Sequence, residues 1–339
     1  MKISCGIIGL PNVGKSSLFN WLTNQNVRSE NYPFCTIEPN VGISSVPDNR
    51  QKNINNIVKT KNIIPAQVKF IDIAGLIKGA SLGEGLGNKF LSNIRDTQAI
   101  IHVVRCFEDK KIISSLKKEI DVITTLDIIN TELLLADIEI IKNRIDNKKK
   151  RFVYTKQEKM FFKNLLEHVS SGFNIRNFDG IKKYYKLTKD MGLLTLKPII
   201  YVVNVDKHYD KLILENIKKY VKSDNSPVIA LDVKNKDNID MLNIIIKETY
   251  KMLDMITFFS VGKKEIRAWS IKNNSSALEA ANKIHSDIKK GFIKAEVVSY
   301  DDYIKYKDEN LMKSLGKYRK EGKKYIVQDG DIINFRFNI

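Results

Sequence analysis

The residues best suited to chemistry form a glycine-rich segment near the start of the chain, G-L-P-N-V-G-K-S at residues 9–16. It fits the pattern G-x-x-x-x-G-K-[S/T], in which a backbone loop wraps phosphate oxygens. An apolar run precedes it at residues 3–8, and a helix-forming run follows at residues 17–22. Strand, loop and helix therefore occur in the order that a phosphate-binding loop needs. The alternative, a chance match in a glycine turn, is disfavoured by this flanking pattern.

This loop predicts contacts to a nucleoside triphosphate. Lys15 is expected to reach the β- and γ-phosphates, and the Ser16 hydroxyl is expected to bind Mg²⁺. Together with two positions on a later strand, the predicted nucleotide-binding residues are Asn12, Val13, Gly14, Lys15, Ser16, Ser17, Asn204 and Val205.

Two further segments supply residues for the same site. A D-x-x-G motif ends an apolar run, so Asp72 could hold Mg²⁺ through water and the Gly75 N–H could meet the γ-phosphate. Between the loop and Asp72, Thr36 lies where a first switch region places its Mg²⁺ ligand. We therefore predict Ser16, Thr36 and Asp72 as metal-binding residues, and Lys15 and Gly75 as catalytic ones.

The base-recognition and catalytic positions depart from the GTPase pattern. GTPases read guanine with N-K-x-D, whereas residues 204–207 are N-V-D-K, and a lysine offers only hydrogen-bond donors to guanine's own donors. ATP is therefore expected to bind at least as well as GTP, with adenine read by Asn204 and the backbone around Val205. Leu76 stands where Ras-like enzymes place the water-orienting glutamine, so hydrolysis uses another group or is slow.

Asn12 has two interpretations. It occupies the loop position at which some related enzymes use asparagine to hold K⁺ beside the phosphates, where the cation replaces an arginine finger. Alternatively it only closes the loop through hydrogen bonds to its own backbone. K⁺ is therefore a candidate second cofactor beside Mg²⁺.

Bulk properties narrow the class of protein and its partners. The formal net charge is +18, which favours polyanionic partners such as rRNA within a ribosome, although compositional drift towards Lys, Asn and Ile explains it equally well. We expect no reading of DNA sequence. No stretch approaches the length of a membrane span, and the first strand leaves no room for a signal peptide. Three scattered cysteines fit a reducing environment, so the expected location is cytoplasmic.

The pattern of apolar runs predicts an α/β fold. Six β-branched runs separated by helical segments indicate a parallel sheet, with strands at residues 3–8, 41–46, 68–71, 100–104, 199–203 and 228–231. Nearly a hundred residues separate the fourth and fifth runs, and two amphipathic helical patterns there predict an inserted antiparallel hairpin. Its basic tip at residues 148–151 is a solvated turn or a contact to RNA phosphate.

The last part of the chain has a different character. Strands at residues 266–271, 294–299, 325–327 and 332–337, with one main helix at residues 275–289, suggest a small β-grasp (ubiquitin-like) domain. The predicted domains are a nucleotide-binding (G) domain at 1–123 plus 190–254, an inserted helical domain at 124–189, and a C-terminal domain at 255–339.

Taken together, these segments resemble the YchF (Obg-like) ATPase family, a TRAFAC-class branch of P-loop NTPases. The stretches that carry the resemblance are residues 9–16, 31–40, 72–88, 102–108, 129–133, 265–269, 283–287 and 290–293. The resemblance implies a G domain, an inserted helical domain and a C-terminal TGS domain. It also implies a preference for ATP over GTP, slow hydrolysis and association with ribosomes.

The chain departs from the family pattern in three places. Lys207 replaces the glutamate of the usual N-x-x-E, Ser114 stands where members carry a histidine thought to assist hydrolysis, and the region 232–253 is shorter. We therefore predict a cytosolic Mg²⁺-dependent ATPase whose nucleotide state gates ribosome binding. The alternatives are a ribosome-linked GTPase switch and a nucleotide-gated binding protein with negligible hydrolysis.

Overall fold

The computed structural model describes residues 3–24, 40–73, 86–107, 122–146, 153–207, 209, 211–235 and 238–338. The chain divides into two compact units. The first comprises Met1–Ile43 and Lys69–Ile245, and the second comprises Ser44–Val68 and Ile246–Ile339.

The sheet that carries the phosphate-binding loop has six strands in the order β2-β4-β1-β5-β6-β7. The strands are β1 (Ser4–Ile8), β2 (Val41–Ser45), β4 (Gln67–Asp72), β5 (Ala99–Cys106), β6 (Ile199–Val205) and β7 (Val228–Leu231). The pairs β1–β4, β1–β5, β5–β6 and β6–β7 are parallel, with Ile7 opposite both Asp72 and Ile101. All six predicted strands are therefore confirmed.

Burial explains why the central strands are continuous apolar runs. Every residue of β1 and β6 is buried, as expected for parallel strands covered on both faces. The helices that alternate with the strands are α1 (Lys15–Asn24), α3 (Leu86–Arg95), α7 (Lys211–Tyr220) and α8 (Ile239–Met252). In the part of the chain that the structure describes, no helix combines the length and apolarity needed to cross a bilayer.

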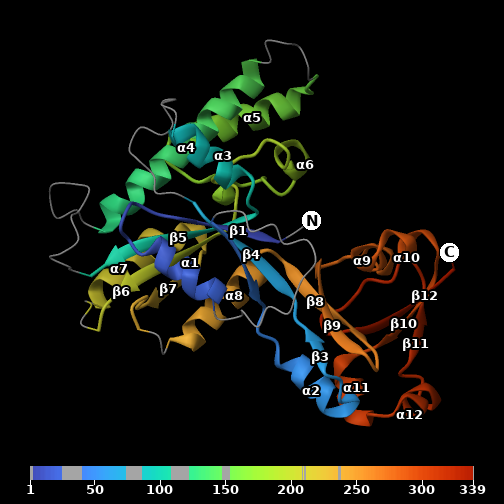
Figure 1. Cartoon of the computed structure of the whole chain (residues 1–339). Coiled ribbons are helices and arrows are strands. Elements are labelled where there is room, and N and C mark those ends of the chain that lie inside the picture. The colour runs from blue at the N-terminus through green and yellow to red at the C-terminus, as the bar shows by residue number, and fades with distance from the viewer. Residues whose placement is uncertain are drawn as a thin grey trace. The chain divides into compact units, whose positions relative to one another are not determined.

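Two long helices lie between β5 and β6, namely α4 (Val122–Asp146) and α5 (Lys156–Ser170). They pack along one another (Figure 1) around a shared apolar cluster that includes Ile141, Phe162 and Leu165. A capping box starts α5, in which Thr155 and Glu158 satisfy each other's backbone N–H groups.

The buried Asp137 joins α4 to the chain just before β6. Its carboxylate accepts hydrogen bonds of 2.7 Å from the backbone N–H groups of Leu194 and Thr195 and from the Thr195 hydroxyl. Burial raises the pKa of Asp137 to about 6, although these three hydrogen bonds act in the opposite direction.

The second unit contains a mixed six-stranded sheet in the order β11-β10-β12-β8-β9-β3. Its strands are β3 (Asn62–Ile64), β8 (Met255–Val261), β9 (Glu265–Lys272), β10 (Phe292–Val298), β11 (Arg319–Glu321) and β12 (Ile332–Phe337). Its helices are α2 (Asn49–Val58), α9 (Ala277–Ile284), α10 (Ser286–Lys290), α11 (Tyr300–Tyr306) and α12 (Glu309–Ser314). Phe258, Ala280 and Phe335 belong to the apolar core between α9 and the sheet.

Two sequence predictions in this unit are wrong in detail. The single helix expected at residues 275–289 is two helices, because His285 is extended and its ring nitrogen caps α10 by accepting from the Asp287 N–H. Residues 325–327 form no strand, because the Tyr325 carbonyl accepts from the Ala277 N–H and the Val327 N–H donates to Ser275. They pair with the start of α9 through one isolated bridge.

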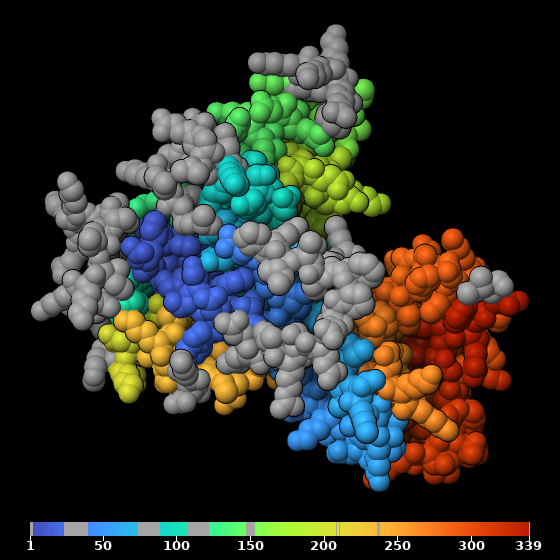
Figure 2. All heavy atoms as spheres, in the orientation of Figure 1, coloured from blue at the N-terminus to red at the C-terminus, as the bar shows by residue number. Residues whose placement is uncertain are grey.

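Residues 44–68 also differ from the prediction, which placed them in the nucleotide-binding domain. In the structure they pack with the C-terminal residues, because β3 pairs with β9 and Ile54 of α2 is fully buried. Figure 2 shows this segment in light blue against the orange and red C-terminal residues.

Candidate nucleotide-binding site

The loop between β1 and α1 has the backbone that phosphate binding requires. Gly14 adopts φ +101°, and a Cβ atom there would lie 2.4 Å from the Asn204 amide nitrogen, so only glycine fits. The Gly14 carbonyl accepts from the Leu18 N–H at 2.9 Å, which starts α1 directly after the loop. The N-terminal N–H groups of α1 are therefore presented beside the loop.

Lys15 is held over this loop. Its side chain is buried, and its ammonium group donates to the Leu10 carbonyl at 2.7 Å. Burial lowers the pKa of Lys15, while the charge of Asp72 opposes that shift. The loop itself thus positions the cation, and its contact to the β- and γ-phosphates stays a prediction.

Ser16 and Asp72 meet at the same end of the sheet. The Ser16 hydroxyl donates to Asp72 Oδ2 at 2.7 Å, and Asp72 Oδ1 is buried with no hydrogen-bond partner among the described residues. A hydroxyl beside a carboxylate with an unsatisfied oxygen suits a hard cation such as Mg²⁺, which prefers oxygen ligands and keeps several waters. These two residues therefore fit the predicted metal role.

Asn204 lies at the end of β6, as predicted, and its amide joins two segments. Its Nδ2 donates to the Val13 carbonyl at 2.9 Å, and its Oδ1 accepts from the Val233 N–H at 3.3 Å. The Val205 side chain next to it is buried, whereas Lys207 is exposed. The contact between Asn204 and the loop is a feature that the sequence reasoning missed; its only local signal was an asparagine ending an apolar strand.

The other predicted positions have different outcomes. Asn12 is exposed with φ +63°, a left-handed conformation that asparagine tolerates, and Ser17 is exposed on α1. His102 lies within β5, and burial, reinforced by the positive charges of Lys15 and Arg176, lowers its pKa to about 3. It is therefore neutral and part of the sheet.

Several sequence predictions concern residues outside the described ranges. These are Thr36, Gly75, Leu76, Ser114 and the basic stretch at residues 148–151.

The glycine loop, the buried Lys15 and the Ser16–Asp72 pair, set at one end of a parallel sheet, define a P-loop nucleoside-triphosphate-binding protein. Comparisons with known proteins agree. The family model described as 50S ribosome-binding GTPase matches residues 4–156, and the model YchF-GTPase_C, described as a protein of unknown function, matches residues 255–338.

Full-length relatives then identify the branch. The chain is 47% identical to the ribosome-binding ATPase YchF of Buchnera aphidicola subsp. Schizaphis graminum, 41% to that of Bacillus subtilis and 40% to that of Escherichia coli O157:H7, with 100% of both chains covered in each case. The solved structure of the Schizosaccharomyces pombe YchF GTPase matches with a TM-score of 0.86 and 32% identity, covering 99% of this chain and 98% of that one. The chain belongs to the YchF family, which confirms the resemblance noted in the sequence.

Proposed function

We propose that this chain is a Mg²⁺-dependent ATPase that hydrolyses ATP slowly and whose nucleotide state gates its binding to the ribosome. The observation that carries the proposal is the Ser16–Asp72 hydrogen bond beside the buried Lys15. Ser16, and Asp72 through water, would hold Mg²⁺, with Thr36 as the predicted third ligand. Mg²⁺ would supply charge neutralisation to the transferring phosphoryl group. The names of the bacterial relatives support ATP as substrate and the ribosome as partner.

The preference for ATP rests on the end of β6. Lys207 occupies the position of the guanine-reading aspartate and is exposed, so no acidic acceptor stands there. The Asn204 amide donates to the Val13 carbonyl and accepts from the Val233 N–H, so Asn204 positions the loop. We assign adenine recognition to Asn204's remaining hydrogen-bonding capacity and to the backbone around Val205.

Slow turnover follows from the replaced catalytic groups. Leu76 cannot orient water, and Ser114 lacks the imidazole that family members carry. Lys15 and the Gly75 N–H are left to stabilise charge on the γ-phosphate, and K⁺ held beside Asn12 is the proposed additional cation.

The remaining parts of the chain are assigned to partner binding. We infer that α4 and α5 form the inserted helical domain and that residues 255–339 form a TGS domain of β-grasp type. Ribosome contacts are assigned to the hairpin tip and to a C-terminal basic group: Lys289, Lys290, Lys317, Arg319, Lys323 and Lys324. A cytoplasmic location accords with a ribosomal partner.

Calorimetric titration with ATP and GTP, each with Mg²⁺ and with EDTA, tests the nucleotide assignment. ATP is expected to bind at least as tightly as GTP, and a hundredfold preference for GTP would establish the GTPase alternative instead. The alternative has support in the description of the N-terminal family model and in the name of the fission yeast relative, a YchF GTPase.

Cosedimentation with ribosomes across a salt series tests the partner. Phosphate contacts release counterions, so association should fall steeply with salt, and it should differ between ATP and ADP. Absence of association at low salt would remove the partner assignment, and equal binding to any RNA would leave only a basic surface.

A further inference from the structure

Residues 44–68 lie, in the sequence, between two segments that are predicted to supply Mg²⁺ ligands. They follow the stretch that contains Thr36 and precede Asp72, yet they pack within the C-terminal unit. Both strands that flank the segment cross this division, since β2 runs from Val41 to Ser45 and β4 from Gln67 to Asp72. Where β2 begins and β4 ends, the Asp72 N–H donates to the Asn40 carbonyl at 2.9 Å. The segment is therefore joined to Asp72 at both ends, through β4 directly and through β2 by way of the Asn40 carbonyl.

A strand pairing holds one side of the segment. β3 adds to the edge of the C-terminal sheet parallel to β9, with Asn62 opposite Glu265 and Ile64 opposite Arg267. Just before β3, the buried Thr60 hydroxyl donates to the Lys264 carbonyl at 2.8 Å. Residues 62–64 are thus bound through backbone groups, which specify register without depending on side-chain identity, and the Thr60 hydroxyl adds one side-chain contact.

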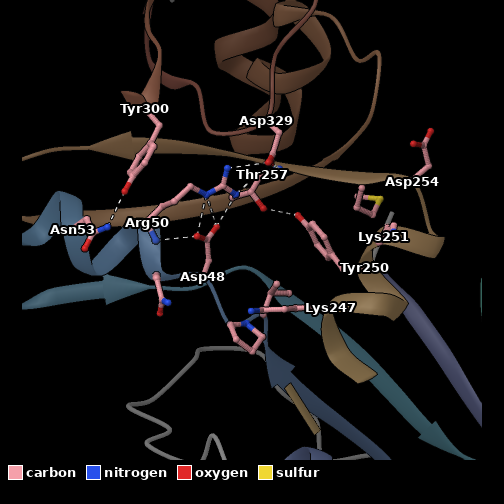
Figure 3. Close-up of a pocket in the computed structure, with 14 residues that line it drawn as sticks. Asp48, Arg50, Asn53, Lys247, Tyr250, Lys251, Asp254, Thr257, Tyr300 and Asp329 are labelled. Atoms are coloured by element: carbon pink, nitrogen blue, oxygen red, sulfur yellow. Dashed lines mark hydrogen bonds and ion pairs between the residues drawn. The ribbon is translucent and has the colours of Figure 1, made fainter. Parts of the chain in front are cut away.

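Arg50 of α2 holds the other side. Its guanidinium pairs with Asp48 at 2.7 Å and with Asp329 at 2.8 Å (Figure 3). It also lies 5.3 Å from the ring centre of the buried Phe259. Asp329 Oδ1 also accepts from the Thr257 N–H at 2.8 Å, so the carboxylate is fixed to β8.

A second, weaker contact lies along the same helix. The Asn53 amide donates to the Tyr300 hydroxyl at 2.8 Å (Figure 3). Arg50, Asn53, Tyr300 and Asp329 line one pocket of about 580 Å³ in the C-terminal unit. The Arg50–Asp329 pair is partly exposed, with side-chain exposures of 26% and 52%, so it contributes modestly and can be broken and reformed.

We propose that residues 44–68 couple the phosphate site to the C-terminal unit. The inference rests on the proposed function, since it needs Asp72 to respond to the Mg²⁺–triphosphate state. β4 begins inside the segment, at Gln67, and ends at Asp72. A change at Asp72 therefore acts along β4 on a segment whose α2 and β3 belong to the C-terminal unit. Docking of this segment on β8 and β9 thereby differs between ATP and ADP, and the C-terminal unit senses the nucleotide. Coupling of this kind is reciprocal. The factor by which the bound nucleotide changes the docking equilibrium is therefore also the factor by which docking changes the affinity for ATP relative to ADP.

Hydrogen–deuterium exchange of the full chain with Mg²⁺ and either ADP or a non-hydrolysable ATP analogue tests the proposal. Amides of β3 and β9 are expected to exchange at rates that differ about fivefold or more between the two nucleotides. Arg50→Ala, and the milder Asn53→Ala, should speed exchange in β3 and shrink that difference. Lys313→Ala is the matched control, because it breaks an exposed ion pair with Glu309 in the same unit without touching residues 44–68.

The outcomes distinguish failure of the coupling from failure of the proposed function. If both nucleotides bind and exchange in β3 and β9 is identical, or if Lys313→Ala acts like Arg50→Ala, the coupling is wrong and the proposed function stands. If calorimetry shows no nucleotide binding, the proposed function and the coupling both fail.

Discussion

Ser16 Oγ and Asp72 Oδ2 are joined by a hydrogen bond of 2.7 Å, although 56 residues separate them in sequence. The parallel pairing of β1 and β4 produces this contact, since it sets Ile7 opposite Asp72 at the point where β1 gives way to the loop. An oxygen from the loop and an oxygen from the D-x-x-G strand are thus presented to one position, which is the geometric basis for a metal–phosphate site.

The metal assignment predicts separable effects of three substitutions. Asp72→Asn should reduce the gain in ATP affinity that Mg²⁺ confers by about tenfold or more, because it removes a charge that acts through metal-bound water. Ser16→Ala should do the same by removing an oxygen ligand, while Lys15→Ala should abolish tight triphosphate binding with or without Mg²⁺. Calorimetry with Mg²⁺ and with EDTA measures all three, and Asp96→Asn, an exposed carboxylate of the same unit, is the control. Normal ATP binding by Lys15→Ala would refute the loop assignment.

Base recognition can be tested by restoring the missing acceptor. Lys207→Asp should raise the affinity for GTP relative to ATP by about tenfold, because one charged hydrogen bond to guanine contributes roughly 1.5–3 kcal/mol. Lys207→Ala removes the amine without adding an acceptor, so the GTP-to-ATP ratio should change little. If the two variants gave the same ratio, residue 207 would not face the base.

The structure gives Asp137 a predictable effect on stability. Its folded-state pKa of about 6 lies above the ordinary value of 3.8, so between those pH values the folded chain keeps a proton that the unfolded chain releases. The contribution of Asp137 to the free energy of unfolding is therefore fully present below about pH 4 and lost as pH rises through 6. The full shift corresponds to roughly 3 kcal/mol, at about 1.4 kcal/mol for each pKa unit.

Asp137→Asn is the variant that isolates this effect. It should destabilise the chain by about 1–3 kcal/mol at low pH, because the amide nitrogen cannot accept a hydrogen bond from the donors of Leu194 and Thr195, whereas both oxygens of the protonated carboxyl group can. The gap between wild type and variant should then narrow as pH rises from 4 to 7 in urea-unfolding experiments. A gap that is independent of pH would contradict the raised pKa.

The K⁺ hypothesis concerns Asn12, whose exposed side chain and left-handed backbone suit either interpretation. If Asn12 helps to hold K⁺, replacing Na⁺ by K⁺ at constant ionic strength should raise the hydrolysis rate. Asn12→Ala should abolish that difference and leave nucleotide affinity largely intact. Equal rates in the two salts, for the free and the ribosome-bound protein, would leave Asn12 with a structural role only.

The parts of the fold that follow from local pattern could be predicted from the sequence. The six strands of the first sheet are short apolar runs, and the loop at residues 9–16 is a contiguous motif, so both are encoded in neighbouring residues. The break at His285 was missed because helical periodicity continues across it, and only the cap formed with Asp287 reveals the interruption.

Other features depend on residues far apart in the chain, and no local pattern encodes them. The bond between Asn204 and the Val13 carbonyl spans 191 residues, and the ion pair between Arg50 and Asp329 spans 279. The three residues of β3 would suit either sheet, and tertiary packing alone decides that they join β9.

Single-turnover hydrolysis of ATP, measured with and without Mg²⁺ and with and without ribosomes, tests the central claim most directly. We predict slow Mg²⁺-dependent turnover of ATP that Lys15→Ala eliminates, with a rate that changes when ribosomes are added. Turnover no faster than that of Lys15→Ala under every condition would contradict the ATPase assignment and identify the chain as a nucleotide-binding protein without hydrolysis.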